Sequence, residues 1–459
     1  MNTKWDFNLC KGYIKRIYKS PKRKNMCCIV IPTYNQYNIT KKTIELLKKQ
    51  TISPEIIIID NASNDRTFEK IIREFPDVTV IELKKNYGSS GAQYIGAVYA
   101  LSQGYDYIIL SDNDAQPIDI TLVEDILKKA TKEKAVVIPT NLFGGNITGF
   151  SKEKTKITTS PLHYLCIPRD ILENCGLPIF NLFLKADDYE LTTRISKKRY
   201  RITRIDSRYY HPIKIIPSPL ANYYLLRNYI VITKLHNDIY KAKNVFNTLL
   251  SWGIINITLS TIYMNPKIFT NSFLLAIRDA FTQRLGKAPY KFPIIKSSHV
   301  VDIDHIKKHG PEATLFIYYK NSEVITRIKK AKILDKHRFI EIRDTPSIRK
   351  QIKYISEIIK HRSRILILLE PLTPHAGYLL LLFGSIWTIN LSTEDNKIHI
   401  IYNERIIKRI TKILIGAILT LLLVVPLTLG AMMYYAFIYK TPAIQRRQFD
   451  PCNTGETIP

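Results

Sequence analysis

Residues 55–60, Glu-Ile-Ile-Ile-Ile-Asp, decide the fold, because four consecutive isoleucines leave no polar face for solvent. A strand that is apolar on both faces is typical of a parallel sheet with helices covering each side. Similar runs occur at 27–31, 78–83 and 107–110, with helical periodicity at 40–49, 67–74 and 91–102 between them. The alternation predicts an α/β domain with a mostly parallel sheet.

Polar residues follow three of the predicted strands. They are Pro32, Thr33 and Tyr34 after the first strand, Asp60 after the second, and Asp112 and Asp114 after the fourth. Ligands gather at the carboxyl ends of parallel strands, so we expect all three clusters on one edge of the sheet. Each cluster alone has another explanation, since such residues also favour turns and helix caps. Three clusters in one sheet favour a binding site.

Asp112 and Asp114 stand two residues apart, so their oxygens can face a common point. Mg²⁺ and Mn²⁺ prefer oxygen ligands, and a bound ion would neutralise charge on a departing nucleoside diphosphate. Asn86, Gly88 and Gly91 lie in a turn before a predicted helix, where a phosphate or ribose could approach the backbone. A glycine-containing turn before any helix looks the same, so this signal is weak alone.

Three carboxylates, Asp187, Asp188 and Glu190, precede a further amphipathic stretch. Sugar transfer with inversion needs a base for the acceptor hydroxyl, and Asp188 is the candidate. Stabilisation of a helix N-terminus is the competing explanation for these acids. His211 follows the next predicted strand, as a further metal ligand or as a surface imidazole.

The order of these motifs resembles the family 2 glycosyltransferases of the GT-A fold. The motifs are, in chain order, Ile-Pro-Thr-Tyr-Asn (31–35), Asp-Asn-Ala-Ser-Asn-Asp (60–65), Asn-Tyr-Gly-Ser-Ser-Gly (86–91), Ser-Asp-Asn-Asp (111–114) and Asp-Asp-Tyr-Glu-Leu-Thr-Thr-Arg (187–194). Tyr-Tyr-Leu-Leu-Arg-Asn (223–228), which ends in Arg227 and Asn228, is similar to a segment of the rhamnosyltransferase and galactofuranosyltransferase branch.

The resemblance implies a role for individual residues. Thr33 and Asp60 would contact the nucleotide, Asp112 and Asp114 would bind ribose and metal, Asp188 would act as base, and His211 would join the metal, which would be Mn²⁺ or Mg²⁺. Tyr94 and Ala92 depart from the branch, in which the corresponding positions are often Asn and Gly. Donor contacts at that helix are therefore open.

The remaining chain predicts several further segments. We expect a basic leader at 1–25, the catalytic domain at 26–240, a helical membrane-proximal segment at 241–292, a small α/β module at 293–400, a transmembrane helix at 411–440 and a short tail at 441–459. Residues 413–439 form an uncharged run that is long enough to span a bilayer as a helix. Residues 245–264 are uncharged but polar, which favours an interfacial helix. More basic residues precede than follow the predicted span, which favours a cell-membrane protein with a cytoplasmic catalytic domain.

The net charge of +29 requires an anionic environment or solvent. A nucleic-acid-binding protein is one explanation, but the charge is spread along the chain and no nucleic-acid motif stands out. We therefore expect membrane lipids, a nucleotide diphosphate sugar and a glycan or lipid-linked glycan acceptor as partners, and no nucleic acid. A polyprenyl-phosphate sugar synthase of the same fold and a non-catalytic membrane scaffold are the alternatives.

Overall fold

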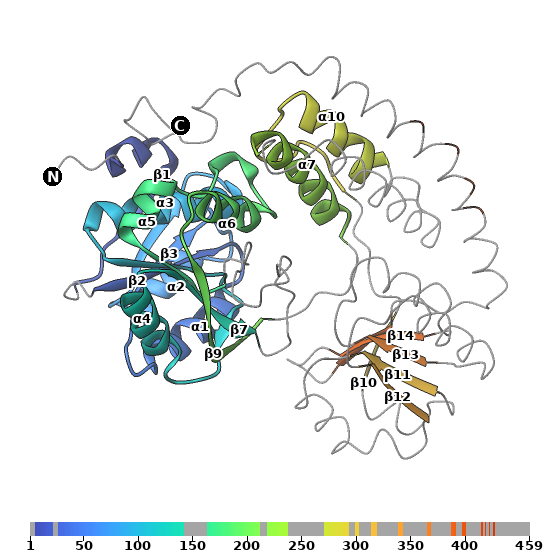
Figure 1. Ribbon diagram of the computed structural model, residues 1–459, viewed down its shortest axis with the longest axis horizontal. Helices are drawn as coiled ribbons and strands as arrows, with labels where there is room; N and C mark the ends of the chain where they lie inside the picture. Colours follow the sequence, from blue (N-terminus) through green and yellow to red (C-terminus); the bar gives the residue numbers. More distant parts are fainter. Residues whose placement is uncertain are drawn as a thin grey trace. The chain divides into compact units, whose positions relative to one another are not determined.

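The chain folds into two compact units in the computed structural model (Figure 1). The structure describes residues 5–21, 26–141, 163–211, 218–236 and 270–292, six strands between 299 and 400, and positions 415, 418, 422 and 426. The first unit holds residues 1–211, 283–289 and 441–459, and the second holds 212–282 and 290–440.

A nine-stranded sheet forms the centre of the first unit, in the order β1-β4-β3-β2-β5-β8-β7-β9-β6. Its strands are β1 (Ile14–Tyr18), β2 (Cys27–Thr33), β3 (Glu55–Asp60), β4 (Thr79–Leu83), β5 (Tyr107–Leu110), β6 (Gln116–Pro117), β7 (Val136–Asn141), β8 (Leu165–Pro168) and β9 (Ile202–Tyr210). The four strands β4-β3-β2-β5 are parallel, as predicted. The prediction of a mostly parallel sheet is nevertheless wrong, because four of the eight strand pairs are antiparallel.

Helices cover both faces of this sheet, because side chains of the central strands alternate between two apolar clusters. Ile29 and Ile31 pack in one cluster with residues of α1 (Tyr37–Lys48), α2 (Thr67–Glu74) and α4 (Leu122–Glu133). Val30, on the opposite face, packs with α3 (Gly88–Gln103), α5 (Arg169–Cys175) and α6 (Asp187–Lys197). The two-sided burial expected from the isoleucine run is confirmed.

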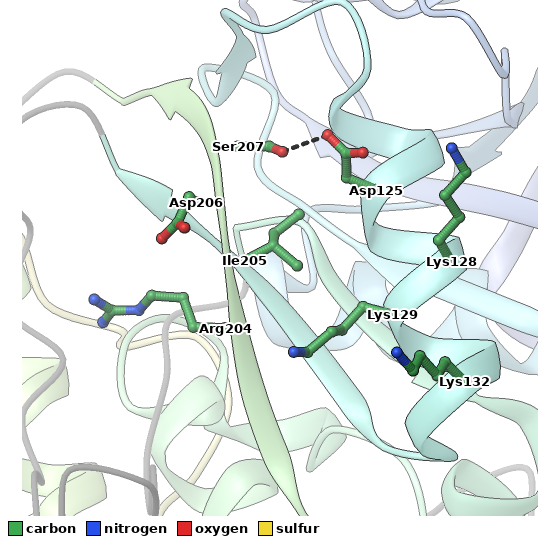
Figure 2. Close-up of a pocket in the computed structure, with 8 residues that line it drawn as sticks. All are labelled: Asp125, Lys128, Lys129, Lys132, Arg204, Ile205, Asp206 and Ser207. Carbon is green, nitrogen blue, oxygen red and sulfur yellow. Dashed lines mark hydrogen bonds between the residues drawn. The ribbon is translucent and has the colours of Figure 1, made fainter.

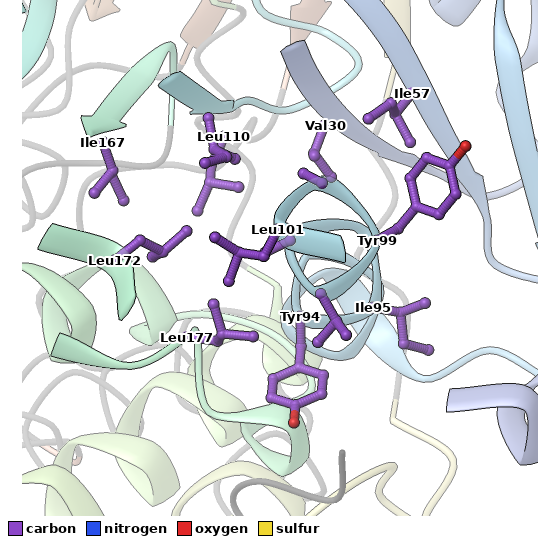
Figure 3. Close-up of a cluster of buried hydrophobic side chains, with 14 of the residues drawn as sticks. Val30, Ile57, Tyr94, Ile95, Tyr99, Leu101, Leu110, Ile167, Leu172 and Leu177 are labelled. Carbon is purple, nitrogen blue, oxygen red and sulfur yellow. The ribbon is translucent and has the colours of Figure 1, made fainter. Parts of the chain in front are cut away.

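Helix α3 lies deep in the second of these clusters (Figure 3). A Cβ at Gly96 would lie 2.3 Å from Cγ1 of Val30, so the glycine allows close contact between α3 and the sheet. Tyr94 is fully buried, and its ring packs edge-on against Trp5 and Phe180. The departure from the family pattern at Tyr94 is thus a feature of the core.

Part of the predicted basic leader, residues 5–21, is described by the structure and contains a helical turn and a strand. A 3-10 helix, η1 (Phe7–Tyr13), leads into β1, which pairs antiparallel with β4 at the sheet edge. Lys15 and Arg16 both form ion pairs with Glu82 on β4. Two of the basic residues that suggest a leader in the sequence are therefore ion-pair partners on an edge strand.

The second unit contains a helical part and a six-stranded sheet. The helical part comprises α7 (Pro219–Leu235), the π-helical turn η3 (Thr270–Leu274) and α10 (Leu275–Phe281). The hydroxyl of Tyr223 on α7 donates to Oδ2 of the fully buried Asp279 on α10 at 2.7 Å. Asp279 thus ties α7 to α10, and Tyr290 donates to the same carboxylate at 2.8 Å.

The sheet of the second unit has the order β10-β15-β14-β13-β11-β12. Its strands are β10 (His299–Asp302), β11 (Thr314–Tyr318), β12 (Arg338–Ile342), β13 (Ile365–Leu368), β14 (Trp387–Leu391) and β15 (Lys397–Ile400). Strands β12, β11, β13 and β14 are parallel, and β15 and β10 continue antiparallel. All six strands lie within residues 293–400, where the sequence predicts a small α/β module.

Among the described residues, no helix has the length and apolar character that crossing a bilayer requires. The predicted span at 411–440 lies outside those residues except at four positions, and the segment at 245–264 lies outside them completely. Both remain predictions.

Candidate functional site

The polar clusters of the parallel strands meet at one edge of the sheet, as predicted. Thr33 at the end of β2 is in register with Asp60 at the end of β3. The backbone N–H of Asn61 donates to the carbonyl of Thr33 at 2.9 Å, and that of Ser111 donates to the carbonyl of Val30 at 3.1 Å. These contacts hold the ends of β2, β3 and β5 together and bring the predicted nucleotide contacts side by side.

The side chain of Thr33 is buried and lies 2.8 Å from the hydroxyl of Thr40 on α1. Asn113, between the two predicted metal ligands, donates to the same hydroxyl at 3.1 Å and to Gln36 at 2.8 Å. Pro32 is buried beside Thr33, whereas the neighbouring Tyr34 is 41% exposed. Of the first predicted cluster, Tyr34 is therefore the side chain that solvent, or a ligand, can reach.

Asp60 is almost fully buried, and its Oδ1 accepts a hydrogen bond from the backbone N–H of Ser63 at 3.0 Å. Burial raises the pKa of this carboxyl to about 6, although its hydrogen bonds with Ser63 oppose the shift. A buried hydrogen-bond acceptor at the end of a parallel strand suits an N–H or O–H group of a nucleotide.

The loop before α3 is fastened to the end of β3 by Asn61. The Asn61 amide donates to the carbonyl of Gly88 at 2.9 Å, and its oxygen accepts from the N–H of Tyr87 at 3.0 Å. Gly88 has a φ of +79°, and a Cβ there would lie 1.9 Å from the carbonyl oxygen of Phe183. Asn86 accepts from the N–H of Gly88 at 2.8 Å.

Gly91 is constrained as well, because a Cβ there would lie 2.8 Å from Cβ of Tyr87. The loop from Asn86 to Gly91 therefore has a structural explanation of its own. Its predicted donor contacts remain predictions.

A cluster of carboxylates and imidazoles lies beyond the ends of β5 and β9. Nε2 of His163 lies 3.2 Å from Oδ2 of Asp112, and the ring of His163 stacks on that of His211 at 4.0 Å. One ligand atom each from Asp112, His163 and His211 lies within 4.8 Å of the others. A carboxylate oxygen and two imidazole nitrogens are a donor set that fits a divalent cation.

Asp114, which the sequence predicts to be a metal ligand, is not in this group of three. Its Oδ1 lies 3.2 Å from Nε2 of His211, as a partner of the histidine. His163 is the residue that the sequence did not predict, because it follows no motif. Its place depends on the antiparallel pairing of β5 with β8, in which Leu110 is opposite Leu165. Two residues beyond this pair, Asp112 and His163 face each other.

Asp187 and Asp188 begin α6 after two residues in the left-handed conformation, Lys185 and Ala186. Burial, together with the nearby charges of Asp188 and Asp112, raises the pKa of Asp187 to about 8. Burial also raises the pKa of Asp188, while Lys185 and His163 lower it. The predicted base thus belongs to the same electrostatic cluster as the candidate metal ligands, and a raised pKa strengthens a carboxylate as a base.

Glu190 has a structural role in α6. It is buried and forms a two-pronged ion pair with Arg194, at 2.6 and 2.7 Å. Arg194 also donates to the carbonyls of Cys175 and Leu177, so the pair fastens α6 to the end of α5.

The predicted site residues Arg227 and Asn228 lie on α7 in the second unit. Arg227 is fully buried and donates to Oδ1 of Asn228 at 2.9 Å. Its guanidinium lies over the rings of Tyr223 and Tyr224, and burial lowers its pKa. This packing accounts for the segment within the second unit, and a role for it in catalysis stays a prediction.

An open cavity of about 390 Å³ lies between α4 and β9 (Figure 2). Its lining residues are Asp125, Lys128, Lys129, Lys132, Arg204, Ile205, Asp206 and Ser207. Lys128 and Lys129 are paired with Glu124 and Glu133 at 2.6 and 2.7 Å, which offsets much of their charge. None of the predicted site residues lines this cavity.

Residues 28–183 match the model of the family described as Glycosyl transferase family 2. A galactofuranosyltransferase GlfT1 from Mycolicibacterium smegmatis is 24% identical over 212 residues, which are 40% of this chain and 70% of that protein. An undecaprenyl-phosphate mannosyltransferase from Micrococcus luteus is 30% identical over 88 residues, 18% of this chain and 36% of that protein. Among solved structures, TarS 1-349 from S. aureus is similar at a TM-score of 0.39 and 19% identity, over 57% of this chain and 82% of that chain. A TM-score this low carries no functional argument.

Proposed function

We propose that this chain moves a sugar from a nucleoside diphosphate sugar to an acceptor hydroxyl, with inversion at the anomeric carbon, because residues 28–183 match the Glycosyl transferase family 2 model. The observation that carries the proposal is the convergence of Asp112, His163, His211 and Asp188 at the edge where Thr33 and Asp60 end their strands. One electrostatic cluster then holds both a base and a cation site beside a nucleotide site.

The proposed reaction is a single displacement. Asp188 takes the proton of the acceptor hydroxyl while the oxygen attacks the anomeric carbon. The bond from that carbon to the diphosphate oxygen breaks, and the nucleoside diphosphate leaves. A divalent cation bound by Asp112 and the two histidines would supply positive charge for the leaving diphosphate.

The proposed acceptor is a glycan on a lipid carrier, made at the cytoplasmic face of the cell membrane. The support comes from the uncharged run at 413–439, the net charge of +29 and the prenyl-phosphate substrate named for one relative. Anionic lipid attracts basic residues by about 1 kcal/mol each near the surface, which favours a membrane over nucleic acid for an anchored chain.

The test is release of nucleoside diphosphate by the purified full chain from a panel of nucleotide sugars, with and without Mn²⁺ or Mg²⁺. We expect release to need metal and Asp188→Asn to lower turnover about 10²- to 10⁴-fold. Asp170→Asn, an exposed carboxylate in the first turn of α5, is the matched control and should be neutral. No release from any donor, with membrane lipid extract as acceptor, would support a non-catalytic scaffold.

A second candidate is sugar transfer to a polyprenyl phosphate, which the mannosyltransferase relative favours. A phosphate acceptor is already ionised at neutral pH and needs no base. Full activity of Asp188→Asn with a prenyl phosphate, together with loss of activity on hydroxyl acceptors, would select this second function.

A further inference from the structure

We propose that His163 is a direct ligand of the active-site cation, and that the two imidazoles make the site select Mn²⁺ over Mg²⁺. This inference rests on the proposed function, but it concerns a residue that no motif of the chain assigns. The sequence alone does not distinguish Mn²⁺ from Mg²⁺, whereas this proposal does.

The sheet topology places His163 at the cation site. Strand β8 begins at Leu165, directly opposite Leu110 at the end of β5. The chain therefore enters the sheet at the point where Asp112 leaves it. On the other side, Gln116 of β6 pairs with Tyr210 of β9, which brings Asp114 beside His211. Three separate loops thus deliver one carboxylate and two imidazoles to one place.

The surroundings of His163 orient its ring for ligation. Nδ1 of His163 lies 3.2 Å from the hydroxyl oxygen of Tyr209, and Tyr209 is 3% exposed. When Nδ1–H donates to this oxygen, the lone pair of Nε2 faces Asp112. In this tautomer Nε2 and Oδ2 of Asp112, which lie 3.2 Å apart, can both ligate one cation, whereas in the other tautomer Nε2–H donates to the carboxylate.

His211 has an equivalent second partner, because its Nε2 lies 3.2 Å from Asp114. Ligating histidines usually give their other nitrogen to a carboxylate or other acceptor, which fixes the ring. Both imidazoles of the cluster have such a partner. Their ligand atoms and that of Asp112 lie within 4.8 Å of one another, close to twice a metal–ligand bond of about 2.1 Å.

The donor set decides which ion fits. Mg²⁺ takes oxygen ligands and retains much of its water, whereas imidazole nitrogen suits transition metals. A centre with Asp112 alone would treat Mg²⁺ and Mn²⁺ similarly. The addition of His163 and His211 shifts the preference toward Mn²⁺ and Co²⁺.

The first test measures the binding of Mn²⁺ and Mg²⁺ to the full chain by calorimetry. The variant is His163→Asn, and the control is His236→Asn, at the residue that directly follows α7. We expect His163→Asn, which removes a ligand nitrogen, to weaken Mn²⁺ binding by more than the roughly 10- to 100-fold that loss of a supporting residue costs, with little change for Mg²⁺. His236→Asn should leave both affinities unchanged. Equal Mn²⁺ affinity in His163→Asn and the unaltered protein would overturn the proposal.

The second test needs no folded variant. Pulsed electron paramagnetic resonance of Mn²⁺ bound to the unaltered protein counts ligating nitrogens, and two imidazoles are expected. A single imidazole nitrogen would overturn the role of His163 even if the variant fails to fold. Donor turnover that proceeds fully without metal would instead contradict the metal-dependent function, whatever the nitrogen count.

Discussion

Oδ1 of Asp114 lies 3.2 Å from Nε2 of His211, so this aspartate supports a histidine rather than facing the cation site directly. Loss of such a supporting carboxylate typically costs 10- to 100-fold in metal affinity. We therefore expect Asp114→Asn to weaken Mn²⁺ binding within that range, and Asp112→Asn, which removes a ligand oxygen, to weaken it more. Calorimetric titration of both variants makes the comparison. An Asp114→Asn defect equal to or larger than that of Asp112→Asn would return Asp114 to the ligand role predicted from the sequence.

Asp60 should give the first unit a pH-dependent stability. Its pKa is about 6 in the folded chain, against about 3.9 for an unfolded aspartate. The folded form binds more protons between those values, so the free energy of unfolding is highest below about pH 4 and falls as pH rises through 6. The total change is on the order of 3 kcal/mol. Urea unfolding across this range should show a smaller slope for Asp60→Asn than for the control Asp170→Asn; equal slopes would contradict the assignment.

The central strands were predictable from the sequence because burial on both faces leaves an unmistakable apolar run. β3 spans Glu55–Asp60, the bounds that the isoleucines predict. The antiparallel strands were not predictable in this way. β9 mixes charged, polar and apolar residues, and its antiparallel partner β6 lies more than 90 residues earlier, with Gln116 opposite Tyr210. Its partners depend on the folded topology.

The same reason explains why the sequence predicted part of the site. Asp60 is the last residue of the apolar strand β3 and Asp112 lies two residues after the end of β5, so their place at the sheet edge follows from the strand rule. His163 reaches the site only through the pairing of β8 with β5. The N-terminal strand β1 was missed because Lys15 and Arg16 look solvated until Glu82 is placed opposite them.

Asn61 should contribute strongly to stability, since it bridges two loops at the site. Its side chain exchanges hydrogen bonds with the backbone of Tyr87 and Gly88. Asn61→Ala would remove the acceptor of the part-buried N–H of Tyr87 and one donor to the buried carbonyl of Gly88, at a cost of about 1–3 kcal/mol. Chemical denaturation should show this loss, together with a higher KM for the donor. Asn64→Ala, in the same loop but exposed, is the control, and equal stability of the two variants would contradict the bridging role.

The close approach of Phe183 to Gly88 makes that glycine essential for the fold of the site. An alanine would have to adopt a φ of +79° and would place its Cβ 1.9 Å from the carbonyl oxygen of Phe183. The strained backbone and the clash together should cost about 2–5 kcal/mol. Phe183 lies three residues before Ala186, where the chain turns into α6, so we expect relief of the clash to shift Asp187 and Asp188 and lower kcat as well. Gly12→Ala is the matched control, because no atom lies within 4 Å of its added Cβ. Thermal unfolding and turnover of the two variants decide the point: a Gly88→Ala protein as stable and active as Gly12→Ala would show that the loop before α3 can move away from Phe183 at no cost.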